Sequence, residues 1–123
     1  MELDVHAPVL LAPGEGEVVT DRPERTLRIL VELDDLIVTW FRYEPGENGP
    51  NPHIHEDHVD SFYVLEGEIE FLGADEPRRG GPGTFFSAPR NVLHGFRNPG
   101  PGPLRVFNLH TPPGGFVDRV REA

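Results

Sequence analysis

The sequence predicts an all-β fold in a single domain, a jelly roll or another closed barrel of short strands. The 123 residues leave room for one hydrophobic core. The chain also contains 14 glycines and 14 prolines, which lie between short apolar runs such as residues 27–31, 37–41 and 62–65. Short strands separated by turn residues explain this arrangement better than disorder does.

The first half of the chain predicts a series of short extended segments. Residues 7–19 combine valine and leucine with proline and glycine, as in one or two edge strands. Residues 26–32 and 36–44 predict a strand pair that turns at Asp34 and Asp35. Residues 45–52 contain three prolines and two glycines and cannot be helical. The chain then becomes extended again from His53 to His55.

The second half predicts further strands and one short helix. Residues 60–66 and 68–72 predict two strands that turn at Glu66 and Gly67, where glycine allows the positive φ of a tight hairpin. Residues 75–83 predict a loop, and residues 84–88, 93–97 and 104–110 predict the remaining strands. Residues 116–122 predict a C-terminal helix, preceded by prolines and glycines at positions 112–115. No repeat or linker divides the chain, so we expect residues 1–123 to form one domain.

The composition excludes several classes of function. The formal net charge of −10 disfavours nucleic acid and anionic membranes as partners. All 11 basic residues are arginine, which excludes Schiff-base chemistry and P-loop phosphate binding. The absence of cysteine leaves only nitrogen and oxygen atoms as metal ligands. Residues 1–5 do not resemble a signal peptide and no apolar run could span a membrane, so we expect a cytoplasmic protein.

Histidines are concentrated in one part of the chain. Four of the six lie between residues 53 and 94, at His53, His55, His58 and His94. His53 and His55 are two residues apart in an extended segment, so their side chains project from the same face. A carboxylate follows at Asp60, and a buried charge in a barrel needs a partner or a ligand. This combination is typical of a metal site.

Two segments resemble the two motifs of the cupin superfamily. In residues 46–67, His53 and His55 are followed by Asp60, where the family has glutamate, and then by Gly67. In residues 83–98, the second motif is matched at Gly83, Pro89, His94 and Asn98. With its flanking strands the resemblance covers residues 25–111. It implies a small single-domain cupin of the Cupin_2 type, with a cupin jelly-roll β-barrel.

The resemblance also implies one divalent transition metal, bound by His53, His55, His94 and Asp60. Three neutral imidazoles and one carboxylate suit Mn, Fe, Co, Ni, Cu or Zn. Asp60 is one methylene shorter than the family's glutamate, so the sequence leaves open whether Asp60 or His58 completes the metal sphere.

The same barrel interior is expected to contain a substrate pocket. We expect it to be lined by Trp40, Phe62 and Phe96, with His110 at its mouth; simple core packing is the alternative for the aromatic residues. Where the family has glycine in the second motif this chain has Asn91, a residue suited to a left-handed turn.

The expected function is that of a metal-dependent enzyme acting on a small organic molecule. A redox-active metal would suit a dioxygenase, and a Lewis acid would suit an isomerase, cyclase or decarboxylase. His58 and Asp60 are the catalytic candidates, as proton acceptors. The alternatives are a non-catalytic module that binds or senses a small ligand, and a barrel that the metal only stabilises. A homodimer is expected through the exposed N-terminal strand, as in other small cupins.

Overall fold

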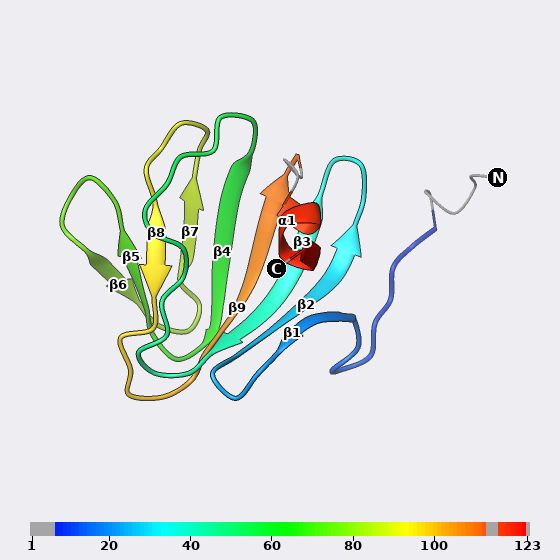
Figure 1. Cartoon of the computed structure of the whole chain (residues 1–123), viewed down its shortest axis with the longest axis horizontal. Coiled ribbons are helices and arrows are strands. Elements are labelled where there is room, and N and C mark those ends of the chain that lie inside the picture. The colour runs from blue at the N-terminus through cyan, green and yellow to red at the C-terminus, as the bar shows by residue number, and fades with distance from the viewer. Residues whose placement is uncertain (1–6, 113–115, 123) are drawn as a thin grey trace.

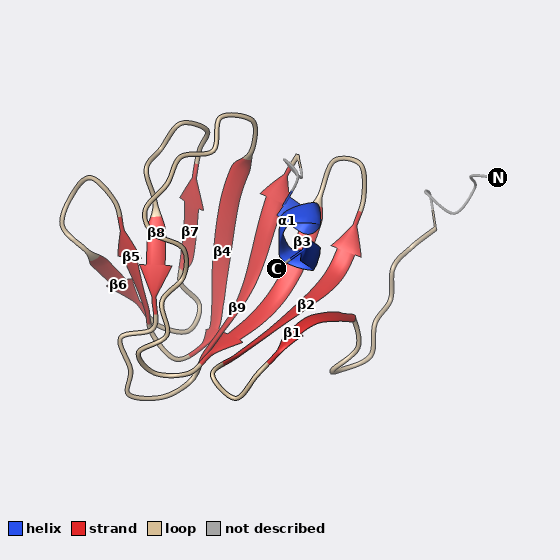
Figure 2. Ribbon diagram, in the orientation of Figure 1, coloured by secondary structure: helices blue, strands red, loops and turns tan. Residues whose placement is uncertain are grey.

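The computed structural model describes residues 7–112 and 116–122, which contain nine strands and one helix (Figures 1 and 2). The elements are β1 (Glu17–Asp21), β2 (Arg25–Glu32), β3 (Ile37–Tyr43), β4 (Val59–Glu66), β5 (Ile69–Leu72), β6 (Arg78–Gly80), β7 (Phe85–Ala88), β8 (Gly95–Arg97), β9 (Leu104–Thr111) and α1 (Phe116–Glu122).

The strands form two antiparallel sheets. One has six strands in the order β1-β2-β3-β9-β4-β7, and the other has three in the order β6-β5-β8. Figure 1 shows the small sheet beside the β4 and β7 end of the large one. Hydrogen bonds between the described strands do not close the two sheets into one continuous barrel. The predicted all-β jelly roll is confirmed, in the form of an open β-sandwich.

The core lies between the two sheets, because alternate residues of the strands point inward. In β3 every second residue from Ile37 to Tyr43 is buried, and in β9 every second residue from Leu104 to His110 is buried. The main core cluster draws on both sheets and consists of Phe41, Tyr43, Phe62, Val64, Ile69, Phe71, Phe96, Leu104 and Val106. Burial of this apolar area is the main force that holds the sheets together.

The inward positions of neighbouring strands become polar toward one end of the large sheet. Asp60 of β4 lies opposite His110 of β9. Thr39 of β3 lies opposite Asn108 of β9. All four side chains are buried. Since buried polar groups need hydrogen-bond partners or a bound ligand, this end of the sandwich is the natural place for a site.

The turn at Gly67 differs from its prediction. Gly67 has a φ of 84°, and a β-carbon there would clash with the backbone carbonyl of Pro103. The strands that it joins, β4 and β5, belong to different sheets and do not pair with each other. The predicted tight hairpin is therefore wrong: Gly67 carries the chain from one sheet to the other.

Two other segments also differ from their predictions. Of residues 7–19, only those from Glu17 onward belong to a strand, and residues 7–16 contain none. The predicted loop at residues 75–83 contains the short strand β6, which pairs with β5. Both segments are rich in proline or glycine. Whether such a segment forms a strand depends on pairing with a neighbouring strand more than on its local sequence.

The helix α1 forms where it was predicted and packs on a second, smaller core. Its residues Val117 and Val120 contact Ile29, Ile37 and Val19 of the large sheet. Arg121 adds ion pairs of 2.7 Å to Glu17 and to Glu32, so the helix is fixed to β1 and β2. No helix in the described part of the chain is long and apolar enough to cross a membrane.

Candidate metal centre

A short antiparallel bridge brings His53 and His94 together. The backbone N–H of His53 donates to the carbonyl of His94 at 2.8 Å, and the N–H of His94 donates to the carbonyl of His53 at 2.9 Å. Asn91 has a φ of 66°, which confirms its predicted left-handed conformation, and its N–H donates to the carbonyl of His55 at 2.8 Å. The backbone thus fastens the second motif to the His53–His55 segment.

Backbone carbonyls also fix the ring orientation of two of these histidines. Nδ1 of His53 lies 2.8 Å from the carbonyl oxygen of Asn51. Nδ1 of His94 lies 2.9 Å from the carbonyl oxygen of Val92. Because a carbonyl oxygen can only accept, each Nδ1 carries the hydrogen and donates it. In the neutral rings the Nε2 atoms then carry no hydrogen and can bind a metal, as in metal sites where a histidine donates its other ring nitrogen to a carbonyl.

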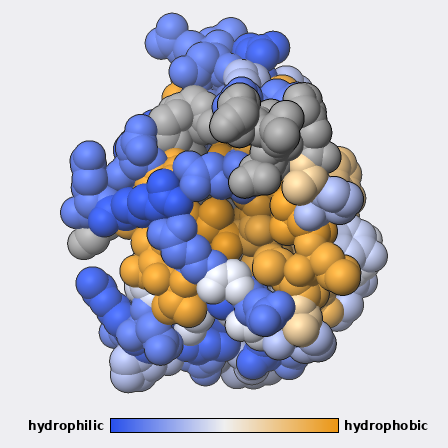
Figure 3. All heavy atoms as spheres, turned by 90° about the vertical axis from the view of Figure 1, so that its right-hand side faces the viewer, coloured by the Kyte–Doolittle hydropathy of each residue, from blue (hydrophilic) through white to orange (hydrophobic). Residues whose placement is uncertain are grey.

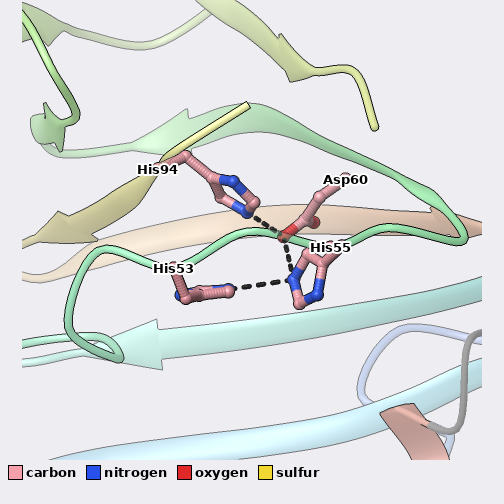
Figure 4. Close-up of side chains that lie close together, drawn as sticks. All are labelled: His53, His55, Asp60 and His94. Carbon is pink, nitrogen blue, oxygen red and sulfur yellow. Dashed lines mark hydrogen bonds and ion pairs between the residues drawn. The ribbon is translucent and has the colours of Figure 1, made fainter. Parts of the chain in front are cut away.

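The ligand atoms of four residues converge at one point (Figure 4). The Nε2 atoms of His53 and His55 are 2.9 Å apart. Oδ2 of Asp60 lies 2.9 Å from Nε2 of His94 and 3.6 Å from Nε2 of His55. All four ligand atoms lie within 4.8 Å of one another. Ligands of a single ion at about 2.0–2.2 Å would be similarly close, so the residues present fit one transition-metal ion.

Asp60 is buried and held by several donors. Its Oδ1 accepts a hydrogen bond of 2.7 Å from the side-chain amide of Asn108 and lies 3.3 Å from Nε2 of His110. Burial by itself would raise the pKa of Asp60, but hydrogen bonds from His110, His94 and Asn108 outweigh it and hold the pKa well below its usual range. The carboxylate therefore remains ionised at neutral pH, as a metal ligand must.

The histidines of the site have different protonation tendencies. Burial, with the neighbouring His58 and His53, lowers the pKa of His55 to about 4, so this imidazole is neutral at neutral pH. Burial also acts to lower the pKa of His94, but hydrogen bonds to Asp60 and Val92 outweigh it and raise that pKa. A proton between His94 and Asp60 thus competes with a metal ion for the same two atoms.

A cavity of about 440 Å³ extends from these residues. The four candidate ligands form one part of its lining, and an aromatic wall formed by Phe41, Tyr43, Phe62 and Phe96 forms another. The ring of Phe96 stacks on those of Phe41 and Tyr43, with centroids 5.2 and 5.5 Å apart. A mostly apolar cavity with a few convergent polar groups is typical of a small-molecule site.

The structure places most of the predicted pocket residues at this cavity, but not Trp40. Phe62, Phe96 and His110 line the cavity. His110 is only 1% exposed, so it lies in the interior rather than at the mouth. Trp40 does not line the cavity: it alternates with the buried residues of β3, and the guanidinium of Arg28 lies 4.1 Å from its ring centroid. The expectation that Trp40 contacts a ligand is corrected by this placement.

The two candidates for the fourth ligand occupy different places. Asp60 joins the three histidines, while His58 is buried beside His55, with ring centroids 4.0 Å apart. His58 does not line the main cavity, so it is poorly placed to accept a proton from a ligand bound there.

The sequence reasoning also missed Asn108, which holds Asp60. The one feature of the sequence that points to Asn108 is its position two residues before His110 in a strand, which places both side chains on the same inward face of β9.

Comparison with known proteins identifies the family of this chain. The family model of the cupin domain, Cupin_2, matches residues 39–110. Quercetin 2,3-dioxygenase of Bacillus subtilis is 27% identical over 96 residues, which are 76% of this chain and 28% of the dioxygenase. The chain thus spans about a quarter of the length of this relative.

Solved structures show the same fold. KdgF from Halomonas sp. has a TM-score of 0.75 and 28% identity, covering 86% of this chain and 94% of KdgF. An RmlC-like cupin from Shewanella frigidimarina has a TM-score of 0.73 and 20% identity, covering 86% and 92% of the two chains. Because the model of the cupin domain family matches more than half of its length, this chain belongs to that family.

Proposed function

We propose that this protein is a metal-dependent enzyme that acts on a small organic molecule with an apolar or aromatic face. One observation carries the proposal: the ligand atoms of His53, His55, Asp60 and His94 converge at the lining of an aromatic-walled cavity. A metal that only stabilised the fold would be expected in a closed set of ligands. Here the ligand set borders a space of a size that suits a small ligand.

The chain's own residues would bind and orient the substrate. The rings of Phe41, Tyr43 and Phe96 offer stacking surfaces for an apolar or aromatic group. Asp60 supplies the negative charge that balances a cation, and the three imidazoles supply neutral nitrogen ligands. When bound, a redox-active ion would supply oxygen chemistry of the dioxygenase type, and a Lewis-acid ion would polarise a substrate carbonyl.

The two catalytic candidates are separated by their positions. We retain Asp60, as the ionised carboxylate that holds the cation at the cavity. We do not propose His58 as the proton acceptor, because it does not line that cavity. The similarity to quercetin 2,3-dioxygenase supports an oxidative reaction. Since the chain spans only part of that enzyme, its flavonol substrate is a starting point for assays and not an assignment.

Metal analysis tests the site. We expect the purified protein to bind one equivalent of Mn, Fe, Co, Ni, Cu or Zn, measured by elemental analysis after reconstitution. His94→Ala removes a ligand from the centre of the site, and His55→Ala removes another. In competition with a chelator, each variant should bind the metal at least about tenfold more weakly than the wild type, and wild-type affinity in both would contradict the proposed ligand set.

Activity assays test the enzyme. Protein reconstituted with each metal would be incubated with flavonols, catechols and diketones, and oxygen uptake would be followed together with product formation under air and under nitrogen. Metal-dependent turnover in air alone supports a dioxygenase, and turnover under both supports Lewis-acid catalysis. Saturable binding of these compounds without turnover, in protein with full metal occupancy, would instead support the ligand-binding module.

A homodimer remains part of the proposal. Within the described chain β1 is an edge strand of the large sheet, paired only with β2. Figure 3 shows an apolar area with hydrophilic residues along its left, right and lower edges, on the side of the molecule that faces right in Figure 1. Exposed apolar side chains at the N-terminal end include Val9, Leu10 and Val18. Size-exclusion chromatography with light scattering would test the dimer, and a monomer at micromolar concentration would contradict it.

A further inference from the structure

A second group of imidazoles lies directly beside the candidate metal centre. It consists of His55, His58 and His110, whose ligand nitrogens lie within 4.8 Å of one another. His55 belongs to both groups. Two of the three, His58 and His110, are only 1% exposed. Such a group differs from a solvated surface cluster, because its members cannot satisfy their nitrogens with bulk water.

One hydrogen bond of His58 leaves its other ring nitrogen able to bind a ligand. Its Nδ1 lies 2.8 Å from Oδ1 of Asp57, and an ionised carboxylate can only accept, so Nδ1 carries the hydrogen. Nε2 is then a lone-pair acceptor. It is buried and has no hydrogen-bond partner among the described residues. A buried acceptor without a partner is unfavourable and calls for an explanation.

The pairing of Asp57 with His58 also matches the way in which metal-binding histidines are supported. In such sites the second ring nitrogen donates to a carboxylate, which orients the ring and makes the ligating nitrogen more basic. Asp57 is largely exposed, with 71% of its side-chain surface accessible, while His58 is not. The carboxylate therefore remains charged at the surface and holds the imidazole from outside.

A route from solvent leads to this group. A surface pocket is lined by His55, His58, Glu56 and Asp57, together with Ile54 and Arg119. Two carboxylates at such an opening attract cations. The main cavity is lined by His55 and His110 but not by His58. The imidazole group therefore lies between the two hollows, with Glu56 and Asp57 at the outer one.

We propose that a transition-metal ion has a second binding position in this chain, formed by His55, His58 and His110. Both positions use His55, so an ion bound at one position withdraws this ligand from the other, and we expect one ion at a time. The first position contains a carboxylate, whereas the second contains imidazoles alone, which suit Zn, Cu, Ni and Co. This inference does not depend on whether the protein is an enzyme.

The test removes the first position and keeps the second. His53→Gln with His94→Gln deletes two ligands of the first group and none of the second. We expect this double variant to bind one equivalent of Co²⁺, with a visible spectrum that differs from that of the wild type. Adding His58→Gln should abolish binding. A double variant that binds no Co²⁺, or a triple variant that still binds one equivalent, would overturn the proposal.

A milder pair of variants covers the case in which the double variant fails to fold. His53 is only partly buried, so His53→Gln alone should keep the fold, as circular dichroism would check. In this protein the first position keeps three of its four ligands and the second keeps all three, so the ion should divide between the two positions, and the Co²⁺ spectrum should change when His58→Gln is added. An unchanged spectrum would contradict a role of His58 in binding the ion.

The carboxylates of the outer pocket supply a matched control. In the His53→Gln/His94→Gln protein, Asp57→Ala should weaken Co²⁺ binding by roughly 10–100-fold, because it removes the partner that orients His58. Glu56→Ala removes the same charge from the same pocket without removing that hydrogen bond and should weaken binding much less. Equal effects of the two changes would show general electrostatic attraction instead of a built site.

Discussion

The side-chain amide of Asn108 donates a hydrogen bond of 2.7 Å to Oδ1 of Asp60. The same amide donates to the carbonyl of Ser61 at 2.8 Å, so its own position is fixed by the backbone of β4. With Oδ1 held in this way, Oδ2 faces Nε2 of His94 and Nε2 of His55. Asn108 therefore positions the one carboxylate of the candidate metal centre, although it is not itself among the candidate ligands.

Asn108→Ala should lower metal affinity without removing a ligand. Asp60 would lose its orienting donor, and loss of such an outer partner typically reduces affinity by about 10–100-fold. Competition with a chelator of known affinity would measure the change. Asn98→Ala is the matched control, since Asn98 is a buried asparagine that bonds the carbonyls of Tyr43 and Gly102 instead. It should destabilise the fold by about 1–3 kcal/mol and leave metal affinity unchanged; an equal loss in both variants would contradict a specific role of Asn108.

Gly95→Ala should weaken metal binding through the backbone. A β-carbon at Gly95 would lie 3.0 Å from the carbonyl oxygen of Pro50 and from the nitrogen of Pro52. The segment that leads into His53 would have to move away from β8, which carries the chain on from His94. We expect a drop in affinity of at least about tenfold, comparable with the loss of an outer-shell partner. Metal titration would measure it.

The control for this change is another glycine outside the site. A β-carbon at Gly102 would have no neighbour within 4 Å, so Gly102→Ala should leave both metal affinity and stability nearly unchanged. If Gly95→Ala bound metal as tightly as the wild type, the close contact between the two motif segments would not be what positions His53 against His94.

Much of the candidate site could be predicted because it depends on strand periodicity and local motifs. His53 and His55 share a face in any extended segment, and the second motif supplied His94. His110 and Asn108 meet Asp60 only through the pairing of β4 with β9, in which Asp60 lies opposite His110. This pairing joins residues about fifty positions apart, and the sequence does not specify its register locally.

The face of Trp40 could not be predicted for a related reason. In β3 the inner row contains Ile37, Thr39 and Phe41, while the outer row contains Val38 and Trp40. Both rows are largely apolar, so alternation does not distinguish them. The structure shows that Arg28 of β2 covers the Trp40 ring from the neighbouring strand, which explains how a large aromatic residue is accommodated on the outer face.

Trp40→Phe should therefore affect stability and not the site. The variant keeps an aromatic ring but loses most of the attraction between Arg28 and the indole, which contributes about 0.5–1 kcal/mol at exposed positions. Phe96→Ala is the contrasting change, because Phe96 stacks on Phe41 and Tyr43 in the cavity wall. It should cost about 3–5 kcal/mol and alter binding of any cavity ligand. Altered metal affinity in Trp40→Phe would contradict the outward placement.

A buried carboxylate in the small sheet predicts a pH-dependent stability. Glu70 of β5 is 5% exposed. Its two oxygens accept hydrogen bonds from Arg79 at 2.9 Å and from Arg97 at 2.5 Å, and these arginines lie on β6 and β8. The bonds tie the three strands together. They also lower the pKa of Glu70 from its ordinary value, because both guanidinium groups favour the charged carboxylate.

The lowered pKa of Glu70 determines how the stability of the fold changes with pH. A pKa that is lower in the folded state means that Glu70 stabilises the fold above its unfolded pKa of about 4.3. The contribution is lost as the pH falls through the folded pKa. Glu70→Gln should therefore lower the free energy of unfolding at pH 7 by about 1–2 kcal/mol, a modest value because both arginines are half exposed. The difference from the wild type should shrink as the pH falls from about 5 to about 3.

Urea denaturation of metal-free protein at several pH values would measure this difference. Glu66→Gln is the matched control, since Glu66 pairs with Arg105 at 2.6 Å on the exposed surface. Exposed pairs contribute about 0–1 kcal/mol, so its effect should be small at every pH. A gap between Glu70→Gln and the wild type that stayed constant from pH 7 to pH 3 would show that the charge of Glu70 is not what joins β6 and β8 to β5.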